Sequence, residues 1–193
     1  MLIIILRKIY SFFVDIIQTL LLAAAVFLII YVFLFRPFQV NGNSMYPNFF
    51  DKEYVLTSII GLRLKDPKLG DVIVFKAPLD PDKDYIKRVI GTPGDKVLIK
   101  NGSVYLNGKM LNESSYLDPS IKTNAGSFLK EDEEVTAAKD AYFVLGDNRP
   151  YSSDSREWGF VPKESIIGES FFVYWPLKSM GLIGNPFEKI KLH

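Results

Sequence analysis

The pattern of hydrophobic and polar positions divides the chain into two unlike parts. Residues 9–35 are almost wholly apolar, and residues 16–35 carry no charge. A helix that crosses a bilayer needs about 20 apolar residues. The pattern therefore predicts a single N-terminal transmembrane helix, with residues 1–36 forming a cytoplasmic tip and an anchor.

A cleaved signal peptide and a buried core helix are the alternatives to this anchor. A signal peptide has an apolar run of roughly 7–15 residues and a small-residue exit. This run is longer and leaves through Phe35-Arg36-Pro37-Phe38, which favours an uncleaved span. Arg7 and Lys8 favour a cytoplasmic N-terminus and an extracytoplasmic remainder, although Arg36 opposes that orientation. We expect a single-pass protein of the cell membrane.

Residues 37–193 show short runs rich in β-branched and aromatic residues, separated by turn residues, which is typical of β-strands. Asn101-Gly102 and Asn107-Gly108 separate apolar runs and predict tight hairpins, placed in a small β-hairpin subdomain around residues 96–141. The second part is thus predicted to be mostly β, as a partly closed barrel or folded sheet that hides its edges. The expected strands cover residues 38–40, 54–56, 72–75, 85–90, 97–100, 103–106, 142–145 and 166–175.

Composition excludes several kinds of chemistry. A net charge of +1 gives no electrostatic case for binding nucleic acid, and the lack of cysteine excludes thiol nucleophiles and disulfides. The single histidine is His193, at the chain end, where a Ser-His-Asp triad or a histidine-ligated metal is not expected. We expect no metal and no cofactor.

Ser44 is a candidate nucleophile, because it lies on a turn rich in Asn, Gly and Pro just after the apolar segment. Without a usable histidine, its activator would have to be a lysine or another base. A lysine acts as a base only when neutral, so its pKa must fall from about 10.4 to near 7–8 through burial.

Lys87 fits this requirement best, because it lies within an apolar β-like run. Period-two alternation places Tyr85, Lys87 and Val89 on one strand face. The alternative is an edge-strand lysine that prevents aggregation. Lys76 is a rival base, but a neighbouring proline and a strand end predict that it is exposed.

A turn-rich loop over residues 146–156 holds two acids, two arginines and three serines. One interpretation is a framework of Asx turns and ion pairs that shapes the loop. In the other, a serine hydroxyl also orients the base. The two interpretations are compatible.

Four motifs in order behind an anchor resemble the type I signal peptidases (leader peptidases), which are membrane-anchored Ser/Lys endopeptidases of bacteria. The resemblance covers about residues 10–176. The motifs are Gly42-Asn43-Ser44-Met45-Tyr46-Pro47, Gly70-Asp71-Val72-Ile73-Val74-Phe75-Lys76, residues 84–95 and residues 146–162. A short segment between Asp95 and Gly146 is similar to the compact Gram-positive-type members.

The resemblance implies a signal-peptidase-like (LexA-like) antiparallel β catalytic domain over residues 37–193. It also implies Ser44 as nucleophile, Lys87 as general base and Ser152 as the hydroxyl that orients Lys87. The implied support comes from Asp147, Arg149, Asp154 and Arg156. The implied substrate pockets are lined by Phe38, Val40, Phe49, Val74, Tyr85 and Ile86.

Two departures from the family pattern concern the nucleophile turn. Many members carry a serine two residues before the nucleophile as an oxyanion-hole donor, and here that position is Gly42. The oxyanion hole is therefore expected at Ser44 and Gly42 and is expected to rest on backbone N–H groups, chiefly that of Ser44. Asn48 replaces the usual threonine after the proline, which is expected to affect only the turn.

The expected function is removal of signal peptides from exported preproteins after small residues. Preproteins, membrane lipid and the export machinery are the expected partners. A specialised relative with a narrow substrate set, such as pilin subunits, shares every motif and stays open. A membrane-tethered β module that only binds is the alternative from another class.

Overall fold

The computed structural model describes residues 2–61 and 65–188, so His193 lies outside the described residues. The chain forms two compact units, Met1–Phe35 and Arg36–His193. The first is one helix, α1 (Leu2–Leu34). Its stretch Ile4–Leu28 has a mean hydropathy of 2.1 and is long and apolar enough to cross a membrane.

The helix ends one residue earlier than the apolar run does. Phe35 begins strand β1 (Phe35–Gln39) instead of closing the helix. Pro37 explains this end, because a proline disfavours helical backbone in the residue before it and cannot donate a helical hydrogen bond.

The second unit is built mainly from an eight-stranded sheet in the order β1-β2-β11-β3-β4-β9-β10, with β12 paired to β11. The pairs β2–β11, β3–β11, β3–β4, β4–β9, β9–β10 and β11–β12 are all antiparallel, which confirms the predicted mostly β, antiparallel fold. The further bounds are β2 (Tyr54–Ser58), β3 (Val72–Ala77), β4 (Asp80–Gly91), β9 (Ala141–Leu145), β10 (Val161–Pro162), β11 (Ile166–Trp175) and β12 (Gly181–Leu182). Short helices η1 (Arg149–Tyr151), α3 (Ser155–Trp158), η2 (Lys163–Ser165) and η3 (Leu177–Ser179) lie between or after the late strands.

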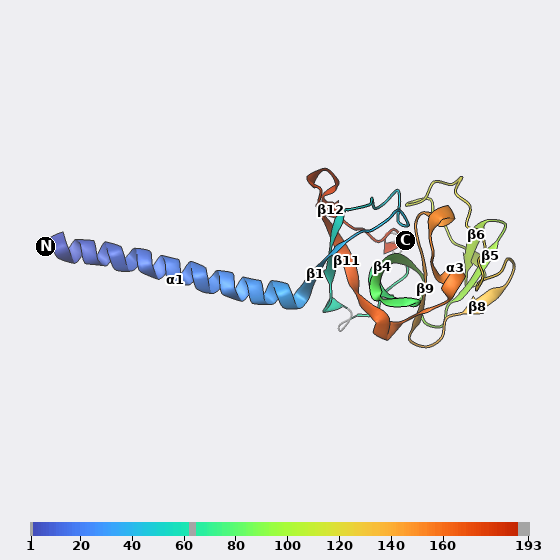
Figure 1. Cartoon of the computed structure of the whole chain (residues 1–193), viewed down its shortest axis with the longest axis horizontal. Helices are drawn as coiled ribbons and strands as arrows, with labels where there is room; N and C mark the ends of the chain where they lie inside the picture. Colours follow the sequence, from blue (N-terminus) through green and yellow to red (C-terminus); the bar gives the residue numbers. More distant parts are fainter. Residues whose placement is uncertain (1, 62–64, 189–193) are drawn as a thin grey trace. The chain divides into compact units, whose positions relative to one another are not determined.

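A second sheet has the order β7-β6-β5-β8 and lies at the end of this unit opposite β1 and β11 (Figure 1). Its strands are β5 (Lys96–Lys100), β6 (Ser103–Leu106), β7 (Lys109–Met110) and β8 (Glu134–Thr136). Asn101, Gly102, Asn107 and Gly108 all have φ between 50° and 77°. These positive angles are what a type I′ turn requires, so both predicted hairpins are confirmed.

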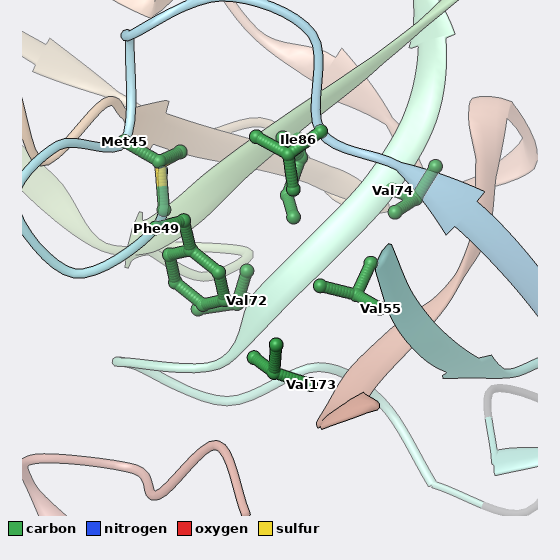
Figure 2. Close-up of a cluster of buried hydrophobic side chains, with 8 residues drawn as sticks. Met45, Phe49, Val55, Val72, Val74, Ile86 and Val173 are labelled. Carbon is green, nitrogen blue, oxygen red and sulfur yellow. The ribbon is translucent and has the colours of Figure 1, made fainter. Parts of the chain in front are cut away.

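A cluster of buried apolar side chains lies beneath the Ser44 turn (Figure 2). Met45 and Phe49 extend from the turn toward Val72, Val55 and Val173 of the sheet (Figure 2). Met45 is fully buried and Phe49 is only 3% exposed. The two side chains fasten the turn to the sheet, which fixes where Ser44 lies.

Candidate active site

The turn that carries Ser44 is closed by its own backbone, and the two ends of its segment are hydrogen-bonded to each other. Tyr46 N–H donates to Asn43 O, and Phe49 N–H donates to Met45 O. At the ends of the segment, Val40 N–H donates to the carbonyl of Glu53. Ser44 N–H has no acceptor among the described residues, so it is free to bind a substrate oxygen.

Lys87 lies in β4, a strand that pairs with β3 on one side and β9 on the other. The alternative of an edge-strand lysine is therefore wrong. Lys87 is 4% exposed, and its Nζ donates to Ser44 Oγ at 2.7 Å and to Ile86 O at 3.0 Å. The rival Lys76 is about half exposed and paired with Asp84 at 2.8 Å, so it is unsuited to act as a buried base.

Burial lowers the pKa of Lys87 from 10.5 to about 8, against an opposing effect of the more distant Asp154 and Asp147. Within the part of the chain that is described, no carboxylate forms an ion pair with Lys87. Its amino group lies instead 5.3 Å from the centre of the Tyr85 ring. A substantial fraction of Lys87 is neutral near pH 8, as a general base must be.

A cavity of about 220 Å³ opens beside Ser44 and Lys87. Of the six residues expected to line a pocket, five are there: Phe38, Val40, Val74, Tyr85 and Ile86. Phe49 is not among the lining residues; it packs with Met45 in the core beneath the turn. Sequence reasoning missed the further lining residues Gln39, Asn41, Val55, Asp84 and Ser153.

The loop over residues 146–156 is shaped by Asp154 and Arg156, whose side chains form a buried pair at 2.8 Å. Asp154 also accepts from Gly146 N–H at 3.1 Å. Arg156 donates to the carbonyls of Arg149 and Ser152. Both ends of the loop are thus tied to one ion pair, which places residues 146–152 against the Ser44 turn.

Asp147 is fully buried and receives two hydrogen bonds from Arg88, at 2.9 and 2.7 Å. Asn48 donates to the same carboxylate at 2.9 Å. The Asn48 side chain therefore links the segment after the nucleophile to the loop, a role that sequence reasoning missed. Alternation along β4 places Arg88 on the face opposite Lys87, where it anchors this carboxylate.

Arg149 is buried and donates to both carboxylate oxygens of Glu113, at 3.0 and 2.5 Å. It also donates to Thr123 Oγ1 at 2.6 Å and to the Tyr116 hydroxyl at 3.1 Å. These contacts tie residues 113–123 to the loop. Sequence reasoning missed all three partners, because they lie in a polar stretch without periodicity.

Two expected contacts are not formed in this structure. Ser152 Oγ is buried and has no hydrogen-bond partner among the described residues, so it does not contact Lys87 in the expected way. Gly42 N–H donates to Asp51 Oδ1 at 2.7 Å, so it is not available as an oxyanion donor. The N–H of Ser44 itself, by contrast, donates to no acceptor among the described residues.

A larger cavity of about 770 Å³ includes neither Ser44 nor Lys87 among its lining residues. Over residues 2–61 and 65–188 there is also no group of three or more His, Asp or Glu side chains placed to hold a metal ion. The reactive groups of the described chain are therefore gathered at the smaller cavity.

A serine hydrogen-bonded to a buried lysine that lacks an acidic partner, beside a small cavity, is the arrangement of a serine hydrolase that uses lysine as its base. Comparison with known proteins gives the family. The sequence profile of the family "Signal peptidase, peptidase S26" matches residues 13–175. The chain belongs to this signal peptidase family and is a serine endopeptidase, as the sequence motifs predicted.

Two relatives found by sequence agree with this assignment. Signal peptidase IB of Staphylococcus aureus (strain MRSA252) is 34% identical over 186 residues, which cover 89% of this chain and 96% of the relative. A probable signal peptidase I-2 of Synechocystis is 38% identical over 156 residues, which cover 78% of this chain and 67% of the relative. The crystal structure of a signal peptidase I from Enterococcus faecalis V583 matches with 32% identity and a TM-score of 0.45, covering 54% of this chain and 97% of that one.

Proposed function

We propose that the protein cleaves signal peptides from exported preproteins, with Ser44 as the nucleophile and Lys87 as the general base. One observation carries the assignment of roles. Lys87 Nζ lies 2.7 Å from Ser44 Oγ while being buried and without an acidic partner. A lysine in this environment loses its proton near pH 8 and can then accept the proton of the serine hydroxyl.

The reaction proceeds in two halves. Neutral Lys87 takes the proton of Ser44 Oγ as this oxygen attacks the carbonyl carbon of the scissile bond. The carbon–nitrogen bond breaks, Lys87 returns the proton to the leaving amine, and the acyl group stays on Ser44 as an ester. Lys87 then deprotonates a water molecule that attacks the ester, and the proton returns to Ser44 as the peptide acid leaves.

The negative charge on the substrate oxygen is stabilised by the Ser44 N–H in both halves. Removing one oxyanion donor typically costs a hundred- to a thousandfold in kcat. Because Gly42 carries no hydroxyl and its N–H is bound to Asp51, the Ser44 N–H is the donor on which the site depends.

Ser152 is proposed to orient Lys87 during turnover. A buried hydroxyl without a partner costs about 1–3 kcal/mol, and the Ser152 Oγ is in that state in the described chain. The Lys87 amino group has one position left after its bonds to Ser44 and Ile86. A rotation of the Ser152 side chain that brings the two together would satisfy both groups.

The cavity favours small side chains on the acyl side of the scissile bond. Val40, Val74 and Ile86 form apolar walls of a space of only about 220 Å³ beside Ser44. Because this space must hold substrate backbone as well as side chains, we expect short side chains to fit best beside the branched residues of the wall. This selectivity matches an enzyme that cleaves after small residues.

The proposed location is the cell membrane, with α1 as a single span, the N-terminus cytoplasmic and the second unit outside. The length and apolarity of Ile4–Leu28 and the positions of Arg7 and Lys8 support it. Several apolar side chains of the second unit are exposed and are proposed to contact lipid; they are Trp175, Leu177, Met180 and Leu182. Preproteins would then meet the active site as they leave the export machinery.

The direct test is cleavage of a purified preprotein, with the two fragments identified by mass. Ser44→Ala and Lys87→Met should each lose nearly all activity, and Lys76→Met is the matched control because Lys76 lies on the neighbouring strand but is exposed. Retention of substantial activity by Ser44→Ala or Lys87→Met would refute the assignment of roles. The exported proteins that stay uncleaved after depletion would separate a general enzyme from a specialised one.

A further inference from the structure

Asn148 holds both carbonyl groups that flank the nucleophile. Its backbone N–H donates to Ser44 O at 3.0 Å. Its side-chain Nδ2 donates to Asn43 O at 2.9 Å. The residue thus joins the 146–156 loop to two successive peptide units of the Ser44 turn.

The side-chain contact acts on the peptide unit that contains the oxyanion donor. Asn43 C=O and Ser44 N–H belong to one planar peptide, in which the two groups point in opposite directions when the bond is trans. The bond is trans, since the cis peptides of the described chain are at Tyr46-Pro47 and Trp175-Pro176. Holding the carbonyl oxygen in place therefore sets the direction of the Ser44 N–H.

The carbonyl oxygen of Asn43 is held from two sides. Tyr46 N–H donates to it at 3.1 Å from within the turn, and Asn148 Nδ2 donates from outside the turn. Hydrogen bonds accepted by a carbonyl polarise its peptide and strengthen the N–H at the other end. Meanwhile the Ser44 N–H itself finds no acceptor in the described chain.

We propose that Asn148 is the positioning residue of the oxyanion hole, and that its side-chain amide compensates for the absence of a hydroxyl at Gly42 by fixing and polarising the Asn43–Ser44 peptide. The inference rests on the proposed function. It assigns Asn148 no contact with the substrate, since the residue acts through the Ser44 N–H. The effect should therefore appear when the oxyanion forms and not when the substrate binds.

Asn148→Ala isolates the side-chain contact, because the variant keeps the backbone N–H that donates to Ser44 O. We expect kcat on a preprotein to fall roughly 10- to 100-fold, which is less than the complete loss of an oxyanion donor causes. KM should stay within about twofold, since a transition-state contact leaves ground-state binding unchanged. Asn148→Asp should be at least as impaired, because a carboxylate cannot donate to the carbonyl.

Binding measurements separate positioning from general damage. A peptide boronic acid ending in an alanine analogue forms a tetrahedral adduct with Ser44, whose boronate oxygen occupies the oxyanion position. Its inhibition constant should rise in Asn148→Ala by the same factor as kcat/KM falls. The dissociation constant of an uncleaved substrate peptide should be equal in Ser44→Ala and in the double variant Ser44→Ala, Asn148→Ala.

Asn185→Ala is the matched control, because Asn185 Nδ2 also donates to a backbone carbonyl, that of Leu69 at 2.8 Å. This variant should lose thermal stability and keep its kcat. The inference is overturned if Asn148→Ala keeps kcat within twofold, if KM rises as much as kcat falls, or if boronate binding is unchanged. Activity in Ser44→Ala would instead overturn the proposed function, so the two failures are distinguishable.

Discussion

The burial that lowers the pKa of Lys87 also lowers the stability of the folded protein. Its pKa is lowered to about 8 by burial, while in the unfolded chain it returns to about 10.4. The unfolded state thus binds more protons between pH 8 and 10.4, so the buried lysine destabilises the folded state most at pH values below 8. A site that needs a neutral amine is less stable than an apolar core in the same place.

Lys87→Met should therefore abolish activity while raising stability. At pH 7 we expect the free energy of unfolding to increase by up to about 3 kcal/mol, from the size of the pKa change. The difference should shrink as the pH rises from 8 to 10.4, because wild-type stability increases over that window. Denaturant unfolding at pH 7 and pH 10 checks this; an equal or lower stability of the variant at pH 7 would contradict it.

Gly146 is required by the close approach of the loop to the nucleophile turn. A Cβ there would collide with Ser152 Oγ and with the carbonyl oxygen of Ser44. We expect Gly146→Ala to lower kcat about a hundredfold, as misplacement by about 1 Å can do. Gly184→Ala is the control, because a Cβ there meets no atom within 4 Å; equal kinetics in the two variants would refute the explanation.

At the level of elements, the site is formed by strand β4 together with the loop of residues 146–156. Alternation along β4 places Lys87 toward Ser44 and Arg88 on the other face, where it binds Asp147. The loop in turn is held by the ion pair between Arg149 and Glu113. The site is therefore stabilised by a segment, residues 113–123, that contributes nothing to the cavity beside Ser44.

Glu113→Ala should destabilise the second unit by about 3–5 kcal/mol, because it leaves the buried Arg149 guanidinium without its acidic partner. Glu134→Ala removes the exposed pair with Lys96, in which both side chains are about half exposed, and should cost at most about 1 kcal/mol. Both tryptophans, Trp158 and Trp175, lie in this unit, so their fluorescence follows its unfolding. Similar losses in the two variants would contradict the buried-pair argument.

The sequence predicted most elements, because long strands and Asn-Gly turns have local signals. Lys87 could be selected from its apolar neighbours alone. Glu113 and Asn148 could not, because their roles depend on loops that meet only in the folded chain. The burial of Phe49 under the turn could not be predicted either, because it depends on packing that the sequence near Ser44 does not show.

At the scale of the whole molecule, we predict that α1 and the unit Arg36–His193 have separate tasks. The dyad, the cavity and their supporting ion pairs all lie in the unit Arg36–His193. If α1 only anchors the enzyme, its contribution is to raise the local concentration of the enzyme at the membrane. Removal of α1 should then change where the enzyme is located and leave the rate of peptide-bond cleavage unchanged.

A variant that lacks residues 1–35 should cleave a short soluble peptide in detergent with nearly the same kcat as the full chain. It should cleave a membrane-inserted preprotein in vesicles much more slowly, by roughly a hundredfold or more at equal enzyme concentration. The full chain reconstituted in the same vesicles is the reference. Equal rates on the membrane substrate would show that the helix does not act as an anchor.

The pH dependence of kcat/KM for preprotein cleavage tests most directly whether neutral Lys87 activates Ser44. Because the free enzyme must lose one proton, log kcat/KM should rise with a slope of one and level off above a pKa of about 8. Below that value Lys87 is charged and activity falls tenfold per pH unit. A profile that is flat from pH 6 to 9, or that has its maximum in acid, would contradict a lysine base.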